Sequence, residues 1–130
     1  MICWSHYRQE PKFQDSFSLI FTEEIDPATG LLPFQARKVA FNLGLSGVAF
    51  KEMTKFVSAL YRAYSESDSS LFEINPVLKT SDDRIIVVDA KVSIDDNALY
   101  RHKDYMAMRD LREENPVEVE AGEKGLNYVD

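Results

Sequence analysis

The spacing of hydrophobic side chains predicts two helices in the first half of the chain. Across residues 47–66, apolar side chains recur at helical steps, as they do on one face of an amphipathic helix. Ser46 is suited to be the N-cap of this helix. The shorter stretch 35–43 has the same period, and Gly44 follows it at the C′ position where glycine commonly ends a helix.

The next segment, 71–92, has the pattern of a β-hairpin. Its polar middle suits a turn centred on Asp82, which places Val77 opposite Val87. Because side chains alternate across a strand, one face of this hairpin then carries only apolar residues, and we expect that face to be buried against the core. These residues are Phe72, Ile74, Pro76, Leu78, Ile86, Val88, Ala90 and Val92.

Further elements are predicted on both sides of these three. A short apolar run, 18–21, is expected to be a strand, and the Pro- and Gly-containing segment 26–30 is expected to be a turn. A third helix is predicted over 103–112, with residues 95–97 suited to cap it. The predicted fold class is α+β: an antiparallel sheet that contains the hairpin, covered on one face by helices.

Composition and charge limit the classes of partner. The chain has 130 residues, is 45% hydrophobic and carries a formal net charge of −7. We therefore expect neither a nucleic acid nor an anionic membrane to be its main partner. An anionic small ligand stays compatible, because a metal ion or a local lysine can reverse the field at one site. The single cysteine excludes an internal disulfide, and no apolar run reaches the roughly 18 residues of a membrane span.

The second face of the predicted hairpin is polar where it crosses the middle of both strands. The turn at Asp82 places Asn75 opposite Asp89 and Glu73 opposite Lys91. Directly opposed residues have Cβ atoms about 4.5–5.5 Å apart, so an Asn oxygen and an Asp carboxylate there can bind one hard cation such as Mg²⁺. The alternative stays open: polar residues on one face of a hairpin are commonly just its solvent-exposed face.

The order of motifs resembles one enzyme family over most of the chain, from about Ile20 to Asp130. The motifs are EIDPATGLLPFQARKVAFNLGL, EINP, VDAKVSIDDNALYRHKDYMAMRD and LNYVD. Together they resemble the β subunit of succinate–CoA ligase, whose nucleotide-binding part is an ATP-grasp domain. The resemblance implies that this chain contains the second lobe of such a domain. The family interconverts succinate, CoA and a nucleoside triphosphate with succinyl-CoA, the diphosphate and phosphate.

The resemblance also implies roles for the polar residues of the hairpin. Asn75 and Asp89 match the two Mg²⁺ ligands of the family. Glu73 matches the acid that meets the phosphorylated histidine of the α subunit. Lys91 is expected to be a structural or electrostatic neighbour without a catalytic role. The implied cofactors are Mg²⁺ with ATP/ADP or GTP/GDP, the implied partner is the α subunit, and the implied location is the bacterial cytoplasm or the mitochondrial matrix.

The resemblance divides the chain into three parts. Residues 1–19 form a leader that does not match the family, 20–115 match the ATP-grasp lobe, and 116–130 match the lead-in to a CoA-ligase-type domain, with a strand expected from residue 126. We expect a fragment of the subunit that is inactive alone. The alternatives are a free-standing module that binds Mg²⁺–nucleotide or an α subunit, an inactive relic, and a related acid–thiol ligase for another dicarboxylate.

Overall fold

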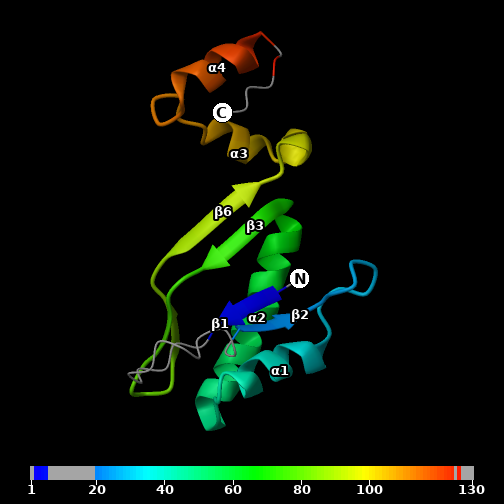
Figure 1. The fold of residues 1–130 in the computed structure, drawn as a ribbon, viewed down its shortest axis with the longest axis vertical. Coiled ribbons are helices and arrows are strands. Elements are labelled where there is room, and N and C mark those ends of the chain that lie inside the picture. Colours follow the sequence, from blue (N-terminus) through cyan, green and yellow to red (C-terminus); the bar gives the residue numbers. More distant parts are fainter. Residues whose placement is uncertain (1, 6–19, 125, 127–130) are drawn as a thin grey trace. The chain divides into compact units, whose positions relative to one another are not determined.

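The computed structural model describes residues 2–5, 20–124 and 126, and these divide into two compact units, Met1–Ser93 and Ile94–Asp130 (Figure 1). Strand β6 (Ala90–Ile94) runs from the first unit into the second. Within the described part of the chain, no helix is long and apolar enough to cross a membrane.

The core of the first unit lies between two helices, α1 (Pro33–Asn42) and α2 (Gly47–Glu66). Five side chains are buried there, and they are Ala36, Val39, Ala40, Met53 and Val57. Both predicted helices are confirmed, and Gly44 follows α1 with φ +71°, a backbone conformation that glycine adopts without a steric penalty. Ser46 is the N-cap residue of α2, but its hydroxyl makes no capping hydrogen bond.

An antiparallel ladder of β1 (Ile2–Ser5) and β2 (Ile20–Glu23) precedes the helices. The strand expected at 18–21 is found two residues further on, and residues 18 and 19 lie outside the described residues. The predicted turn at 26–30 is confirmed: Gly30 donates its backbone N–H to the Asp26 carbonyl at 2.8 Å and has φ +69°. This turn leads from β2 into α1.

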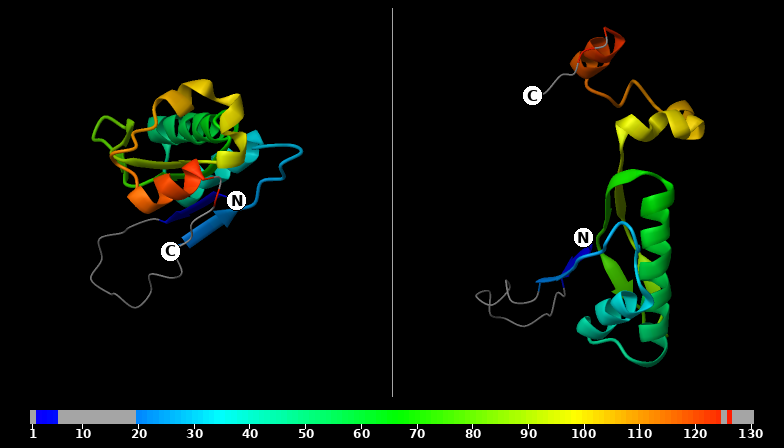
Figure 2. Two further views of the ribbon diagram at one scale, coloured as in Figure 1. Left: turned by 90° about the horizontal axis from the view of Figure 1, so that it is seen from above. Right: turned by 90° about the vertical axis from the view of Figure 1, so that its right-hand side faces the viewer.

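The predicted hairpin is confirmed and consists of two short ladders in succession. Strand β3 (Ser69–Ile74) pairs with β6, and β4 (Val77–Lys79) pairs with β5 (Ile85–Val87). Val77 lies opposite Val87, as the position of the turn predicted. Helix α2 contacts both β3 and β5 and runs along one side of the hairpin (Figure 2). The predicted antiparallel pairing, covered by helices on one side, is therefore present.

The buried face of the hairpin differs from the prediction near the turn and along β6. Phe72 and Ile74 are half-buried as expected, but Leu78, Ile86 and Val88 are 49%, 40% and 58% exposed. Pro76, at the junction of the two ladders, is exposed as well, and so are Ala90 and Val92 on β6, where the predicted burial is also wrong. Val77 and Ile85, from the face expected to be polar, pack instead against the core between α1 and α2. The hairpin therefore exchanges its two faces between the β3–β6 ladder and the β4–β5 ladder.

Backbone hydrogen bonds explain this exchange of faces. In a regular strand, consecutive residues direct their N–H and C=O groups to opposite edges. Here the Asn75 N–H bonds to Asp89 O at 3.3 Å, and the next residue, Pro76, accepts from Val88 N at 3.2 Å. Two consecutive residues on each strand thus bond to the same partner strand. The alternation shifts by one residue on both strands, so the register is kept while the side chains change face.

The second unit contains a 3₁₀ helix (Asp96–Arg101), α3 (Lys103–Ala107) and α4 (Pro116–Glu123). Asp95 caps the first of these by accepting from Asn97 N at 3.0 Å. The predicted capping of the helix at 103 is wrong, because residues 96–101 form the 3₁₀ helix themselves and His102 is the N-cap residue of α3. The helix predicted over 103–112 ends at Ala107 instead. The reason is an Asx turn, in which the Asp110 side chain accepts from the Arg112 backbone N–H at 3.0 Å and competes with helical bonding.

No residue of the second unit is buried among those whose exposure the structure describes: 94–117, 119–121, 124 and 126. The strand expected from residue 126 lies outside the described residues apart from Leu126, which is in no helix or strand.

Candidate functional site

The junction between the two ladders of the hairpin places Asn75 directly opposite Asp89. The hydrogen bond from Asn75 N to Asp89 O fixes this pairing. Both residues lie between strands, Asn75 after β3 and Asp89 before β6. The turn prediction therefore brought these two residues together correctly, and both are exposed.

Glu73 and Lys91 extend the same polar surface along the β3–β6 ladder. Both are exposed, and the register continued from Asn75 and Asp89 places them opposite each other. The half-buried Phe72 and Ile74 point to the other face, which α2 contacts. We call the surface of Glu73, Asn75, Asp89 and Lys91 the outer face of the hairpin.

The polar side chains of the outer face are available to bind a ligand. The four side chains make no hydrogen bond or ion pair with other residues of the described part of the chain. One amide oxygen and one carboxylate, directly opposed, form the kind of hard oxygen set that Mg²⁺ accepts, since this ion commonly takes one or two ligands from protein. Within residues 2–5, 20–124 and 126, no group of three or more His, Cys, Asp or Glu residues could hold a metal ion.

A second acidic group, at Glu23 on β2, has the opposite character. Glu23 is 7% exposed, and its Oε2 lies 2.6 Å from the Lys38 ammonium of α1. Gln35 donates to the Glu24 carbonyl at 2.7 Å and to Glu23 Oε1 at 3.4 Å, and its Oε1 accepts from Leu32 N at 2.9 Å. These contacts join β2 to the start of α1, so Glu23 has a structural role.

The electrostatics of Glu23 agree with that role. The hydrogen bond from Lys38 lowers the pKa of Glu23 below its ordinary value, the hydrogen bond from Gln35 lowers it further, and burial opposes both. Sequence reasoning did not identify this cluster. Its only signal was the position of Gln35 and Lys38, three residues apart on the predicted helix 35–43, which places both on one side of that helix.

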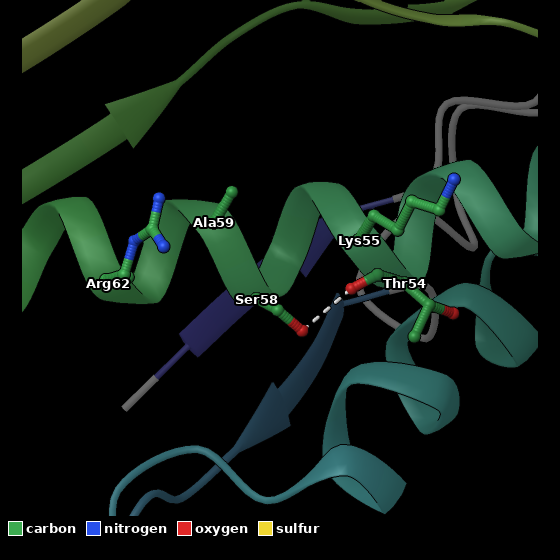
Figure 3. Close-up of a pocket in the computed structure, with 5 residues that line it drawn as sticks. All are labelled: Thr54, Lys55, Ser58, Ala59 and Arg62. Atoms are coloured by element: carbon green, nitrogen blue, oxygen red, sulfur yellow. Dashed lines mark hydrogen bonds between the residues drawn. The ribbon is translucent and has the colours of Figure 1, made fainter.

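A shallow hollow on α2 is lined by Thr54, Lys55, Ser58, Ala59 and Arg62 (Figure 3). Its polar groups already have partners within the helix. The Thr54 hydroxyl donates to Phe50 O at 2.8 Å, and the Ser58 hydroxyl donates to Thr54 O at 2.9 Å. Lys55 lies 2.9 Å from Glu52 Oε1, and Arg62 lies 3.9 Å from Glu66 Oε1. The outer face of the hairpin is therefore the stronger candidate site.

Comparison with known proteins identifies the family of this fold. Residues 14–79, which include Glu73 and Asn75, match the ATP-grasp domain family. The chain belongs to the ATP-grasp family. That membership agrees with the predicted α+β lobe, in which helices α1 and α2 cover one side of an antiparallel hairpin.

Curated relatives extend the match over most of the chain. It is 75% identical over 117 residues to the succinate–CoA ligase [ADP-forming] subunit beta of Christiangramia forsetii, which is 90% of this chain and 29% of the relative. The protein of the same name from Flavobacterium johnsoniae is 74% identical over 86% of this chain and 28% of its own length. The Staphylococcus aureus protein of that name is 49% identical, covering 85% of this chain and 28% of its own.

These relatives confirm the resemblance to succinate–CoA ligase β subunits that the motifs indicated. The chain spans less than a third of the length of the relatives it matches. The aligned residues therefore correspond to one part of each of these relatives.

Proposed function

We propose that this chain contributes the Mg²⁺–nucleotide half-site of a succinate–CoA ligase β subunit. The observation that carries the proposal is the pairing of Asn75 with Asp89, fixed by a backbone hydrogen bond and open on the outer face. ATP-grasp membership and the names of the relatives support it. Because those names specify the ADP-forming enzyme, we propose ATP/ADP rather than GTP/GDP as the nucleotide.

The proposed roles follow from the chemistry of each side chain. Asn75 offers a neutral amide oxygen and Asp89 an anionic carboxylate to the same cation. A magnesium ion at this site would supply positive charge against the phosphate oxygens during phosphoryl transfer. Glu73, two residues before Asn75 on the same face, would accept a hydrogen bond from the imidazole of the α subunit's phosphorylated histidine and so orient that ring.

The larger assembly belongs to the proposal too. We propose residues 20–115 as the ATP-grasp lobe and residues 116–130 as the lead-in to the CoA-ligase-type domain, with the α subunit as partner. Since the relatives with these names are bacterial, the proposed location is the bacterial cytoplasm. The 130 residues alone are expected to form no succinyl-CoA from succinate, CoA and ATP. Detectable product from the pure chain would contradict that expectation.

Calorimetric titration of ADP into the chain at saturating Mg²⁺ tests the half-site. We expect weak binding to the wild type, and a loss of affinity of about tenfold or more in Asn75→Ala and in Asp89→Asn. Asp104→Asn is the matched control, because it removes an exposed carboxylate from α3 and should leave the affinity unchanged. Equal affinities in all four proteins would overturn the proposal.

Of the free-standing modules considered above, the one that binds Mg²⁺–nucleotide without an α subunit remains the second candidate, since the Asn75–Asp89 pair is formed by the hairpin alone. The two candidates differ in their dependence on an α subunit. Pull-down with a purified α subunit of a bacterial succinate–CoA ligase distinguishes them. Association favours the half-site of the enzyme, whereas ADP binding without association favours the separate module.

A further inference from the structure

Lys91 is the one cation on the outer face of the hairpin, and it lies beside the proposed metal site. It follows Asp89 by two residues and is exposed. In an extended strand, residues two apart are separated by about 6.6 Å and point to the same face. Its ammonium, on a flexible four-carbon stem, therefore reaches the space above the Asn75–Asp89 pair.

Lys91 differs from most other lysines in the described part of the chain. Four of those lysines lie within 2.5–2.9 Å of a carboxylate oxygen, and they are Lys38, Lys55, Lys79 and Lys124. Lys91 forms no ion pair with any described residue, although the register continued from Asn75 and Asp89 places Glu73 opposite it. A cation beside an acid on a rigid ladder, yet not bonded to it, is available to a ligand.

The charges on the outer face indicate what that ligand would be. Glu73 and Asp89 contribute two negative charges, and a divalent cation would only neutralise them. Lys91 adds the positive charge that makes the loaded face net positive. The ligand favoured by a divalent cation with an adjacent ammonium is an anion with several oxygens, one set on the metal and another within reach of the lysine.

The geometry points to Lys91 as a phosphate-binding residue that contacts the terminal phosphate of the nucleotide while Asn75 and Asp89 hold the metal. This assignment rests on the proposed function, because it presupposes a metal at that pair. It departs from the expectation that Lys91 is only an electrostatic neighbour. A structural lysine would be bonded to Glu73, and the structure shows no such bond.

The test separates binding of the metal from binding of the phosphate. Mn²⁺ substitutes for Mg²⁺ at oxygen ligands, and loss of its free electron-paramagnetic signal reports binding of the metal alone. Binding of inorganic pyrophosphate at saturating Mg²⁺, followed by calorimetry, reports the phosphate contact without a base or sugar. Wild type, Lys91→Met, Lys91→Arg, Lys51→Met and Asp89→Asn are compared after circular dichroism has shown that each is folded.

We expect Lys91→Met to leave Mn²⁺ affinity equal to the wild type or higher, and to weaken pyrophosphate binding by about five- to tenfold. Lys91→Arg should stay within about twofold of the wild type, because it keeps the charge. Lys51→Met removes the same charge from the exposed side of α2 and should have no effect on either measurement. Added salt should shrink the difference between wild type and Lys91→Met.

Two other outcomes would overturn either the assignment of Lys91 alone or the proposed function together with it. If Lys91→Met and Lys51→Met bind pyrophosphate equally well while Asp89→Asn loses Mn²⁺, the assignment of Lys91 is wrong and the proposed metal site stands. If the wild type and Asp89→Asn bind Mn²⁺ equally, the proposed function is wrong, and the assignment of Lys91 falls with it.

Discussion

Acidic side chains at two places in the first unit have different roles. Glu23, on β2, faces α1 and is bonded to Lys38 and Gln35. Glu73 and Asp89, on the outer face of the hairpin, are exposed and bonded to no other described side chain. Burial of a carboxylate without a partner is costly, so the fold supplies partners to Glu23.

The difference indicates which acids stabilise the fold and which are available for binding. An acid whose charge is balanced inside the chain has its geometry and energy fixed before any ligand arrives. An acid that is held by a rigid backbone but not balanced retains its full affinity for a cation. Substitutions near Glu23 should therefore change stability, and substitutions on the outer face should change binding.

The largest expected effect comes from removing the partner of Glu23. Lys38→Met should lower the free energy of unfolding by about 1–2 kcal/mol, because it leaves a carboxylate that is nearly inaccessible to water without its cation. The value is below that of a fully buried pair since the Lys38 side chain is 53% exposed. Urea denaturation measures it, with Lys51→Met as the control. If Lys38→Met changed the free energy of unfolding as little as the control does, the Lys38–Glu23 ion pair would not stabilise the fold.

Two neighbouring isoleucines test the exchange of hairpin faces. Ile85 packs against the core and Ile86 points outward, although the sequence predicted the reverse. Ile85→Ala should cost about 1–1.5 kcal/mol because the residue is half-buried, and Ile86→Ala about 0.5 kcal/mol or less. Urea denaturation of both variants decides the matter. A larger loss of stability in Ile86→Ala than in Ile85→Ala would instead support the buried face that strict alternation predicted.

The ionisation of Glu23 should make a smaller contribution, which is visible in the pH dependence of stability. Its folded pKa lies below the ordinary value of 4.5, so the unfolded chain binds the proton more tightly. The stabilisation is thus fully present above the unfolded pKa and is lost as the pH falls through the folded pKa. Thermal melts from about pH 7 down to about pH 3 should show a shallower decline in Glu23→Gln than in the wild type. Parallel curves would contradict this.

The smallest effect on stability is expected for the proposed metal ligand. Asp89→Asn without metal should change the free energy of unfolding by less than about 0.5 kcal/mol, because the exposed carboxylate has no described partner to lose. The backbone bond from Asn75 N to Asp89 O is unaffected by the substitution. Urea denaturation in the presence of a chelator provides the measurement. A large loss would place Asp89 with Glu23 as a structural acid.

Local patterns were sufficient for much of the fold. The helical period across 47–66 and the glycine after 35–43 predicted both helices, because periodicity and helix termination depend on residues a few positions apart. The polar turn at Asp82 predicted the register that joins Asn75 to Asp89. The helix over 103–112 was overextended, since the Asx turn of Asp110 competes with a pattern that favours helix.

The sequence by itself determined which residues are neighbours along each element and across the hairpin, and so which side chains lie near Asn75. Only the tertiary structure decided which face of β4 and β5 meets the helices, because successive backbone bonds at Asn75 and Pro76 shift the alternation by one residue. It also decided the burial of Glu23, whose partners lie on a different element. Alternation and period are local properties, whereas burial and charge balance arise only when separate segments pack together.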